Sequence, residues 1–253
     1  MYTGCVDATA YLARIGAAAD DPLDVLMARH LETVPFENLS VHQRDRVPLE
    51  DPALVEKIVD RRRGGFCYEL NGAFAWLLAA LGWDVRYCSA RVATDGGFSF
   101  PGDHMALVAG SSTLVDVGFG RFAVGPLDLD SRDEQPDRAG VFTVRDAPDG
   151  ELDVVWDGRT QYRLDPRPRS LADFVPMAWW HRTSPTSPFT HALLASRLTP
   201  TARVTLSGDL FIETPDDGER TEKKLSVDEQ LATYRDVFGI VLDAVPAALC
   251  SPD

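Results

Sequence analysis

Cysteine is scarce in this 253-residue sequence, and long apolar runs are missing from it. The four cysteines (Cys5, Cys67, Cys88 and Cys250) are scattered and form no CxxC pair, which argues against a disulfide framework and a structural zinc site. No run approaches the roughly 18 apolar residues of a membrane span. The N-terminal residues lack the basic and apolar regions of a signal peptide. We therefore expect no bound metal, no membrane partner and a reducing, cytoplasmic location that suits a working thiol.

Basic residues are also few relative to acidic ones. Lysine and arginine number 25 against 39 acidic residues, which gives a net charge of −14. A nucleic-acid-binding face needs a basic stripe, so nucleic acid is not expected as a partner. A small anionic ligand held by a few local arginines stays compatible with this balance. The hydrophobic content of 45% is ordinary for a soluble globular protein.

The first third of the chain is predicted to be mainly helical. Residues 8–31 and 51–62 have the apolar spacing of amphipathic helices. A third helix follows Gly64-Gly65, because apolar residues recur at intervals of three and four from Phe66 onward. Gly82 then supplies a C-terminal stop.

The middle of the chain changes to short β-rich runs separated by turn residues. The predicted strands are Val85–Val92, His104–Val108, Thr113–Val117, Val141–Arg145, Asp153–Trp156 and Gln161–Leu164. This pattern is typical of an antiparallel sheet or small barrel. In the tail we predict a helix over 190–197, strands over 202–206 and 209–214, and a last helix near 226–237. Helical, β and α/β parts are therefore expected in that order.

The segment RGGFCYELN at 63–71 carries the strongest chemical signal. Cys67 is predicted at or just before a helix N-terminus, where unpaired N–H groups and the helix dipole stabilise a thiolate. The two preceding glycines would let the backbone bend and expose the sulfur. Glu69 and Asn71 could brace the site by hydrogen bonding. The alternative is a buried structural cysteine on a core helix, since free cysteines are usually buried.

A nucleophilic cysteine needs a base and a group that orients the base. His104 begins one predicted strand and Asp116 lies in the next. If their hairpin is centred on Gly110, the two residues face each other with Cβ atoms about 4.5–5.5 Å apart. A buried aspartate costs energy unless it is paired, and an imidazole would pair it. A two-residue turn would instead put the side chains on opposite faces, as an unrelated surface histidine and turn-side aspartate.

These segments together resemble the arylamine N-acetyltransferase family. RGGFCYELNG at 63–72 is similar to its active-site segment, and PFENL at 35–39 to its N-terminal motif. DHMALV at 103–108 matches its histidine strand, and LVDVGFG at 114–120 its aspartate strand. The tail matches with TSPTSPFT at 183–190, RVTLSGDL at 203–210 and FGIVL at 238–242. The resemblance covers nearly the whole chain, in order.

The resemblance implies an α+β fold with a cysteine-protease-like catalytic core. A helical bundle over 1–83 would carry the cysteine. An antiparallel β-barrel over 84–188 would carry the histidine and the aspartate. An α/β lid would occupy 189–253.

The resemblance also implies a Cys67–His104–Asp116 triad that works by ping-pong chemistry. Acetyl-CoA or another acyl thioester would acylate Cys67 and release the thiol. An aromatic amine or hydrazine would then attack the enzyme thioester, while His104 moves the protons. No tightly bound cofactor is expected, because the acyl donor is a co-substrate.

Further roles follow from the same resemblance. Gly118, Phe119 and Gly120 would bind the cofactor part of the donor, because glycines at a strand end let a ligand approach the backbone. By itself this pattern also fits a plain turn. Arg121 follows the glycines and could reach a phosphate, although an arginine there is more often simply solvated. Phe36 and Phe119 would bind substrate, with Phe66, Trp179 and Trp180 as further cleft aromatics. The structural supports would be Glu37, Asn38, Arg63, Glu69 and Asn71.

Two departures from the family pattern keep other functions open. Asp103 stands where the family often has a small hydroxyl residue, and an anion there would repel CoA phosphates unless it points away. The sequence also ends shortly after the FGI segment. Both features fit the related amide synthases, which release an ansamycin-type polyketide from an acyl carrier protein thioester by macrolactam formation. A thiol hydrolase and a silent binding module are more distant alternatives.

Overall fold

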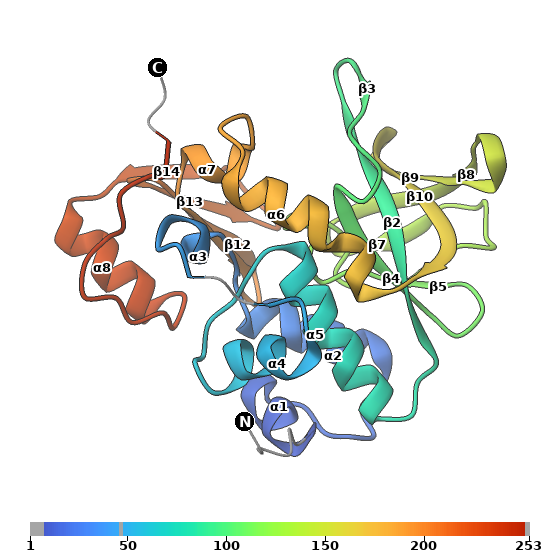
Figure 1. Cartoon of the computed structure of the whole chain (residues 1–253), viewed down its shortest axis with the longest axis horizontal. Coiled ribbons are helices and arrows are strands. Elements are labelled where there is room, and N and C mark those ends of the chain that lie inside the picture. The colour runs from blue at the N-terminus through green and yellow to red at the C-terminus, as the bar shows by residue number, and fades with distance from the viewer. Residues whose placement is uncertain (1–7, 46–47, 251–253) are drawn as a thin grey trace.

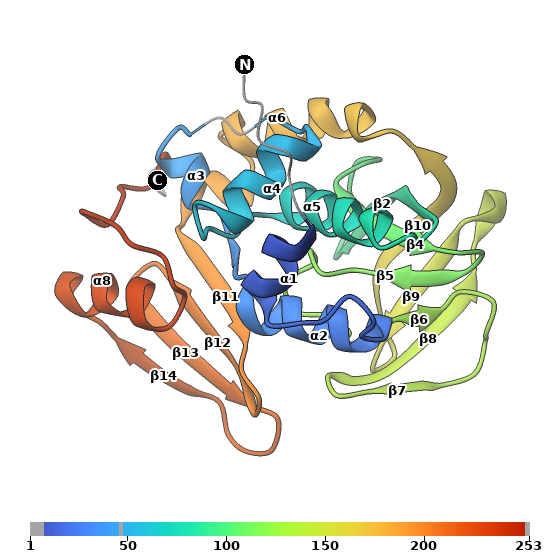
Figure 2. The ribbon, with the colours of Figure 1, turned by 90° about the horizontal axis from the view of Figure 1, so that it is seen from below.

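Two sheets flank a central group of helices (Figures 1 and 2). The computed structural model describes residues 8–45 and 48–250. Cys5 lies outside the described residues, as do both ends of the three-domain division that we predicted. Within the described ranges no helix is long and apolar enough to cross a membrane.

The helical part contains five α-helices in the described chain. They are α1 (Ala8–Ile15), α2 (Leu23–Thr33), α3 (Leu39–His42), α4 (Asp51–Val59) and α5 (Cys67–Ala80). The single helix predicted over 8–31 is wrong, because Gly16 ends α1 with a φ of 68° and Pro22 precedes α2. The predicted stripe on α4 is confirmed at Leu54 and Ile58, which are fully buried. Helix α5 is buried along most of its length and packs at the centre of the molecule.

The middle part is a nearly closed antiparallel barrel. Its strands are β2 (Val85–Thr94), β3 (Gly97–Phe98), β4 (His104–Ala109), β5 (Thr113–Val115), β6 (Leu127–Asp128), β7 (Gln135–Asp137), β8 (Gly140–Asp146), β9 (Leu152–Trp156) and β10 (Arg159–Arg169). They are ordered β6-β5-β4-β2-β10-β9-β8-β7, with β3 paired to β2. Gln135 spans the gap between β7 and β6, since its side chain bonds both the N–H and the C=O of Asp128 at 2.7 and 2.9 Å. All six strands predicted in this region are present.

The C-terminal part is a second sheet covered by a helix. Strands β1 (Phe36–Glu37), β11 (Leu194–Leu198), β12 (Ala202–Ser207), β13 (Leu210–Pro215) and β14 (Thr221–Lys224) are ordered β1-β11-β12-β13-β14, and α8 spans Val227–Asp236. The helix predicted over 190–197 is therefore wrong. The second half of that range is β11, which pairs with strands on both sides and alternates in burial only loosely.

Two helices that were not predicted connect the sheets. Helix α6 spans Val175–Thr183 and α7 spans Pro188–His191. A short 3-10 turn precedes α6, and the Asp173 carboxylate accepts the Ser170 N–H at 2.8 Å there. Pro176 lies in the first turn of α6, where a proline is tolerated. These capping signals, Ser170 and Asp173 followed by Pro176, could have identified the helix from sequence.

Candidate active site

Cys67 is the first residue of α5 and is almost completely buried, with 5% of its surface exposed. The Glu69 carboxylate accepts the Phe66 N–H at 3.2 Å, which fixes the start of the helix. The preceding glycines do not bend the chain through positive φ, contrary to our interpretation. They allow close packing instead: a Cβ on Gly64 would lie 1.8 Å from the Pro35 carbonyl oxygen. The helix start is thus pressed against the PFENL segment.

His104 and Asp116 meet on the barrel, although by a different register from the predicted one. The ladder pairs Leu107 with Val115 and Ala109 with Thr113, so the hairpin is centred on Ser111 rather than Gly110. A shift of two positions keeps both side chains on the same sheet face, because side chains alternate with period two. His104 Nε2 lies 2.7 Å from Asp116 Oδ2. The predicted pairing is confirmed, and the predicted register is wrong.

Four further hydrogen bonds hold Asp116 and its neighbour. The Asn71 amide donates to Asp116 Oδ1 at 2.9 Å and accepts the Val117 N–H at 2.9 Å. The Gly118 N–H also donates to Oδ1, at 3.0 Å. Tyr162, which sequence reasoning missed, donates its hydroxyl to Oδ2 at 3.2 Å. Asn71 extends from α5, so it ties the cysteine helix directly to the aspartate.

At Gly118 the chain that follows β5 approaches α5 closely. A Cβ on Gly118 would lie 2.7 Å from Asn71 Nδ2 and 2.8 Å from Cys67 Cα. Such contacts are too short for any side chain, so only glycine lets the two elements meet. The position therefore sets the spacing between the cysteine and the Asp116 strand.

The electrostatics of the site favour a charged imidazole. Burial by itself would lower the pKa of His104, but the adjoining Asp116 carboxylate and the nearby Cys67 raise it to about 10. His104 is therefore positively charged at neutral pH.

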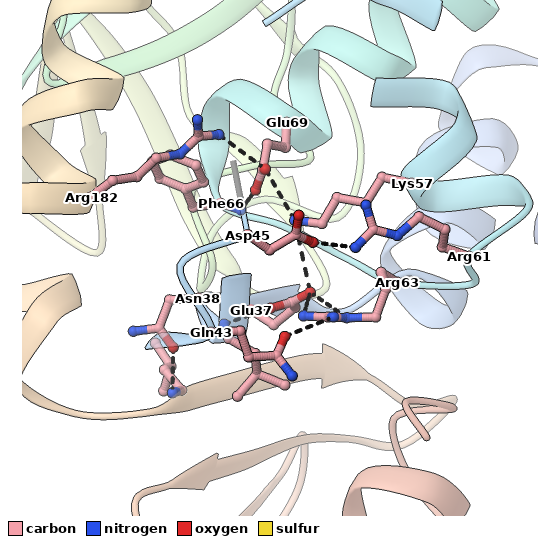
Figure 3. Close-up of polar contacts among 12 residues, drawn as sticks. Glu37, Asn38, Gln43, Asp45, Lys57, Arg61, Arg63, Phe66, Glu69 and Arg182 are labelled. Atoms are coloured by element: carbon pink, nitrogen blue, oxygen red, sulfur yellow. Dashed lines mark hydrogen bonds and ion pairs between the residues drawn. The ribbon is translucent and has the colours of Figure 1, made fainter. Parts of the chain in front are cut away.

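A buried ionic network lies beneath the start of α5 (Figure 3). Lys57 Nζ lies 3.0 Å from Glu69 and 4.0 Å from Glu37, and its side chain is fully buried. Arg63 pairs with Glu37 at 2.8 Å, and Arg182 of α6 pairs with Glu69 at 3.1 Å. Burial would raise the pKa of Glu37, but Lys57 and Arg63 lower it. The network thus favours the ionised form of Glu37 and links α4, α5 and α6.

Asn38 connects the helical part to the C-terminal part (Figure 3). Its amide donates to the Phe189 and Ala192 carbonyls at 3.0 and 2.8 Å and accepts the Leu194 N–H at 2.7 Å. Next to it, the Glu37 N–H donates to the Gly65 carbonyl at 2.8 Å. The PFENL segment therefore holds the cysteine loop on one side and β11 on the other.

Cys67 and His104 open onto a cavity of about 430 Å³. Its apolar lining includes Phe36, Phe100, Phe119, Trp180 and Phe189. Phe36, Gly118, Phe119 and Trp180 are thus found where sequence reasoning expected a ligand. Gly120 is not among the lining residues, Phe66 is buried behind them, and Trp179 lies on the outer face of α6 with 64% of its surface exposed. Phe100 and Phe189 were missed.

Asp103 also lines this cavity, but it is not an isolated anion. Its carboxylate lies 3.0 Å from His181 Nε2. Burial would raise the pKa of Asp103, whereas the bonds from His181 and Ser99 lower it below its ordinary value. The departure from the family pattern at Asp103 is therefore accompanied by a second His–Asp pair within the same cavity.

Comparison with known proteins places this geometry in a family. The profile of a family described as "N-acetyltransferase" matches residues 21–247. The "Arylamine N-acetyltransferase" of Mycobacterium tuberculosis (strain ATCC 25618 / H37Rv) is 37% identical over 229 residues, which cover 80% of this chain and 78% of the relative. The chain belongs to the N-acetyltransferase family. It is an enzyme of the acetyltransferase class, as predicted.

Solved structures of this family share the fold. The arylamine N-acetyltransferase of Mycobacterium marinum superposes with a TM-score of 0.84 at 31% identity, over 92% of this chain and 93% of that one. The same M. marinum enzyme in complex with CoA gives a TM-score of 0.83 at 32% identity, with the same coverage. The predicted α+β fold with its barrel and lid is confirmed by these neighbours. No three histidine, cysteine or acidic side chains in the described part of the chain are grouped so as to hold a metal ion.

Proposed function

We propose that this N-acetyltransferase moves an acetyl group from acetyl-CoA to an aromatic amine or hydrazine through a thioester on Cys67. The observation that carries the proposal is the meeting of Cys67, His104 and Asp116 at an aromatic-lined cavity. The names of the relatives favour this activity over amide synthesis, and they give no support to an acyl carrier protein as donor.

In the first half-reaction, the Cys67 thiolate attacks the carbonyl carbon of the donor thioester. Nε2 of His104 is hydrogen-bonded to Asp116. Nδ1 is therefore the nitrogen that exchanges a proton with the Cys67 sulfur and with the leaving thiol. The C–S bond to CoA breaks, and the leaving sulfur takes the proton that His104 carries. One thioester replaces another, so the step is nearly balanced in free energy.

In the second half-reaction, the amine nitrogen attacks the Cys67 thioester. His104 is neutral after the first step and accepts the proton that the nitrogen loses. The C–S bond to Cys67 breaks, an amide forms, and the His104–Cys67 pair returns to its starting state. The aromatic lining keeps water away from the thioester, so transfer is favoured over hydrolysis.

The tetrahedral oxyanion of both steps needs fixed donors. The first N–H groups of a helix have no intrahelical acceptor. Cys67 is the first residue of α5, so its own N–H is our proposed donor. Gly118 and Phe119 are the proposed contacts for the donor, and Phe36 and Phe119 for the acceptor ring. Gly120 was expected to contact the donor as well; it follows Phe119 with a φ of 88° and is not among the lining residues.

The division into 1–83, 84–188 and 189–253 and the cytoplasmic location also remain our proposals. The first range holds α1 to α5 together with β1, the second holds the barrel strands and α6, and the third holds β11 to β14 and α8. Cytoplasmic residence is supported by the chemistry, because the nucleophile must stay a free thiol.

Steady-state kinetics with acetyl-CoA and a panel of arylamines and hydrazines test the function. Parallel double-reciprocal lines and amine-dependent CoA release are expected. Cys67→Ala should abolish release, whereas Cys88→Ala should keep it, because Cys88 is a buried thiol outside the cavity. CoA release that does not depend on the amine would indicate a hydrolase instead. Failure to use acetyl-CoA, with turnover of a carrier-bound thioester, would indicate an amide synthase.

A further inference from the structure

Three arginines from distant parts of the chain converge on a second, smaller cavity. Arg121 follows the Gly118–Gly120 loop, Arg138 lies in the turn between β7 and β8, and Arg203 lies in β12. The cavity measures about 100 Å³ and lies between the barrel and the C-terminal sheet. In Figure 2 the two sheets approach each other at the ends of β7, β12 and β13. It shares no lining residue with the aromatic cavity.

The positive charge in this cavity is only partly balanced. Arg138 pairs with Asp216 at 2.8 Å and with Glu32 at 3.5 Å. Arg121 contacts the ring of Trp156 at 4.8 Å from its centroid. Arg203 makes one long hydrogen bond, to Ser196 Oγ at 3.4 Å. Among the described residues, neither Arg121 nor Arg203 forms an ion pair with a carboxylate.

Asp216 is the one carboxylate among the described residues that line the cavity, and the carboxylate of Asp137, the residue before Arg138, is already occupied. Asp137 accepts the backbone N–H groups of Val124 and Gly125, at 3.1 and 2.9 Å. It also accepts the Ala139 N–H at 2.7 Å. Its charge therefore serves the turn that presents Arg138, and it does not neutralise the arginine pair across the cavity.

Arg203 shows the energetic cost of this arrangement. Burial, together with the neighbouring charges of Arg121 and Arg138, lowers its pKa to about 10. Partly buried like charges are costly unless a counter-charge enters between them. In a chain with a net charge of −14, such a concentration of arginine points to a specific anion rather than to general surface charge.

We propose that Arg121, Arg138 and Arg203 form a binding site for a phosphate group. Guanidinium groups bind tetrahedral oxyanions with paired hydrogen bonds, and several can share one phosphate. A cavity of about 100 Å³ corresponds to roughly three waters of liquid volume, which is room enough for one phosphate group. The phosphate is either that of a nucleotide-bearing acyl donor or inorganic phosphate. The site does not depend on the proposed acetyl transfer.

Titration calorimetry with inorganic phosphate, at ionic strength matched with sodium chloride, tests the site. Saturable one-site binding is expected for the wild type. Arg203→Gln should weaken it about tenfold or more, because a hydrogen-bonded charged partner is lost. The matched control is Arg159→Gln, an exposed arginine at the start of β10, which should bind like the wild type. Equal phosphate binding by wild type and Arg203→Gln, or no binding beyond that of chloride, would overturn the proposal.

Thermal unfolding provides a second readout that a folding defect would not reproduce. Without phosphate, Arg203→Gln should unfold no earlier than the wild type, because the substitution removes repulsion. With phosphate, the wild type should gain stability and the variant should not. If the variant is too unstable to assay, Arg121→Gln replaces it, since Arg121 is exposed. An equal gain by wild type and variant would contradict the site.

The source of the phosphate is decided by competition. If phosphate and CoA compete, and Arg203→Gln weakens CoA but not a thioester that lacks the nucleotide, the site holds a donor phosphate. Dephospho-CoA then tells whether the 3′-phosphate is the one bound. If phosphate binds without affecting CoA, the site serves inorganic phosphate. Both results support a phosphate site.

Discussion

Asp116 is the most constrained residue of the site. Its two carboxylate oxygens accept bonds from His104, Asn71, Tyr162 and the Gly118 N–H, and its surface is almost wholly buried. A carboxylate held this way has one orientation, so it fixes both the ring position and the protonated state of His104. In the proposed mechanism, Asp116 therefore acts on the chemistry at Cys67 through His104.

Replacing Asp116 with asparagine should lower kcat by about 10³–10⁴-fold, because His104 loses its charge partner and its orientation. The pKa of His104 should fall from about 10 toward 6.5, so that the ring becomes neutral in the neutral pH range. In the wild type, the raised pKa of His104 also contributes to the free energy of unfolding. This contribution is complete below about pH 6.5 and is lost as the pH approaches 10. Steady-state kinetics and an NMR titration of the imidazole measure both effects. Tyr162→Phe is the control, and its kcat should fall by about tenfold or less. An equal fall in kcat in both variants would contradict the role given to Asp116.

Asp103 and His181 should behave as a coupled pair in a double-mutant cycle. His181→Phe leaves the Asp103 carboxylate unpaired in the cavity, where it repels the donor phosphates, so KM for acetyl-CoA should rise about fivefold. Asp103→Asn alone, and the double variant, should stay close to the wild type. The measurement is KM for acetyl-CoA in all four proteins. If the changes in KM of the two single variants add up to the change in the double variant, His181 does not offset the charge of Asp103.

At the scale of elements, the start of α5 is the point where the molecule is held most firmly. The Glu37 and Glu69 carboxylates receive three cationic side chains from α4, the cysteine loop and α6. This cluster also positions α6, whose Trp180 and His181 line the aromatic cavity. Helix α5 thus receives its position from charges as well as from its apolar faces.

Lys57→Met should destabilise the protein by about 3 kcal/mol, because it leaves a buried carboxylate short of a partner. Arg63 and Arg182 remain to limit the loss. Urea unfolding measures the change in the free energy of unfolding. Lys223→Met is the matched control, because the Lys223–Glu229 pair is exposed and its loss should leave the midpoint unchanged. Equal midpoints for the two variants would contradict a stabilising role for the network.

Individual elements also show which features the sequence could predict and why other features could not be predicted. The family resemblance singled out Cys67, His104 and Asp116. The hairpin error of two residues was harmless because it preserved the sheet face. Segment 190–197 was misread because β11 lies between two partner strands, and one of them, β1, is distant in sequence. Tyr162 and His181 were missed for a similar reason: nothing local marks a tyrosine or histidine that meets the site through tertiary packing.

At the scale of the whole molecule, the three parts are interlocked. Strand β1 of the helical part belongs to the C-terminal sheet. Arg197 of β11 donates to the Glu32 carbonyl at 2.7 Å, and Arg138 of the barrel pairs with Asp216 beyond β13. Because strand pairing, hydrogen bonds and an ion pair link the three parts, none of them is expected to unfold alone.

Denaturant unfolding should therefore be a single transition. Far-UV circular dichroism follows the helices, and tryptophan fluorescence follows all three tryptophan-bearing regions, around Trp76, Trp156 and Trp180. The two signals should give the same midpoint, as expected for one cooperative unit. Two separated midpoints would show that the parts are more independent than their contacts indicate.

We propose that Cys67 carries the acetyl group between the two half-reactions, and intact-protein mass spectrometry can detect that acetyl group. The protein is mixed with acetyl-CoA in the absence of any amine, quenched in acid, and mapped by peptide analysis. The account predicts one acetyl group on Cys67 and its rapid loss when an arylamine is added before the quench. An unmodified Cys67, or an acetyl group that stays on it in the presence of every arylamine and hydrazine tested, would contradict the account.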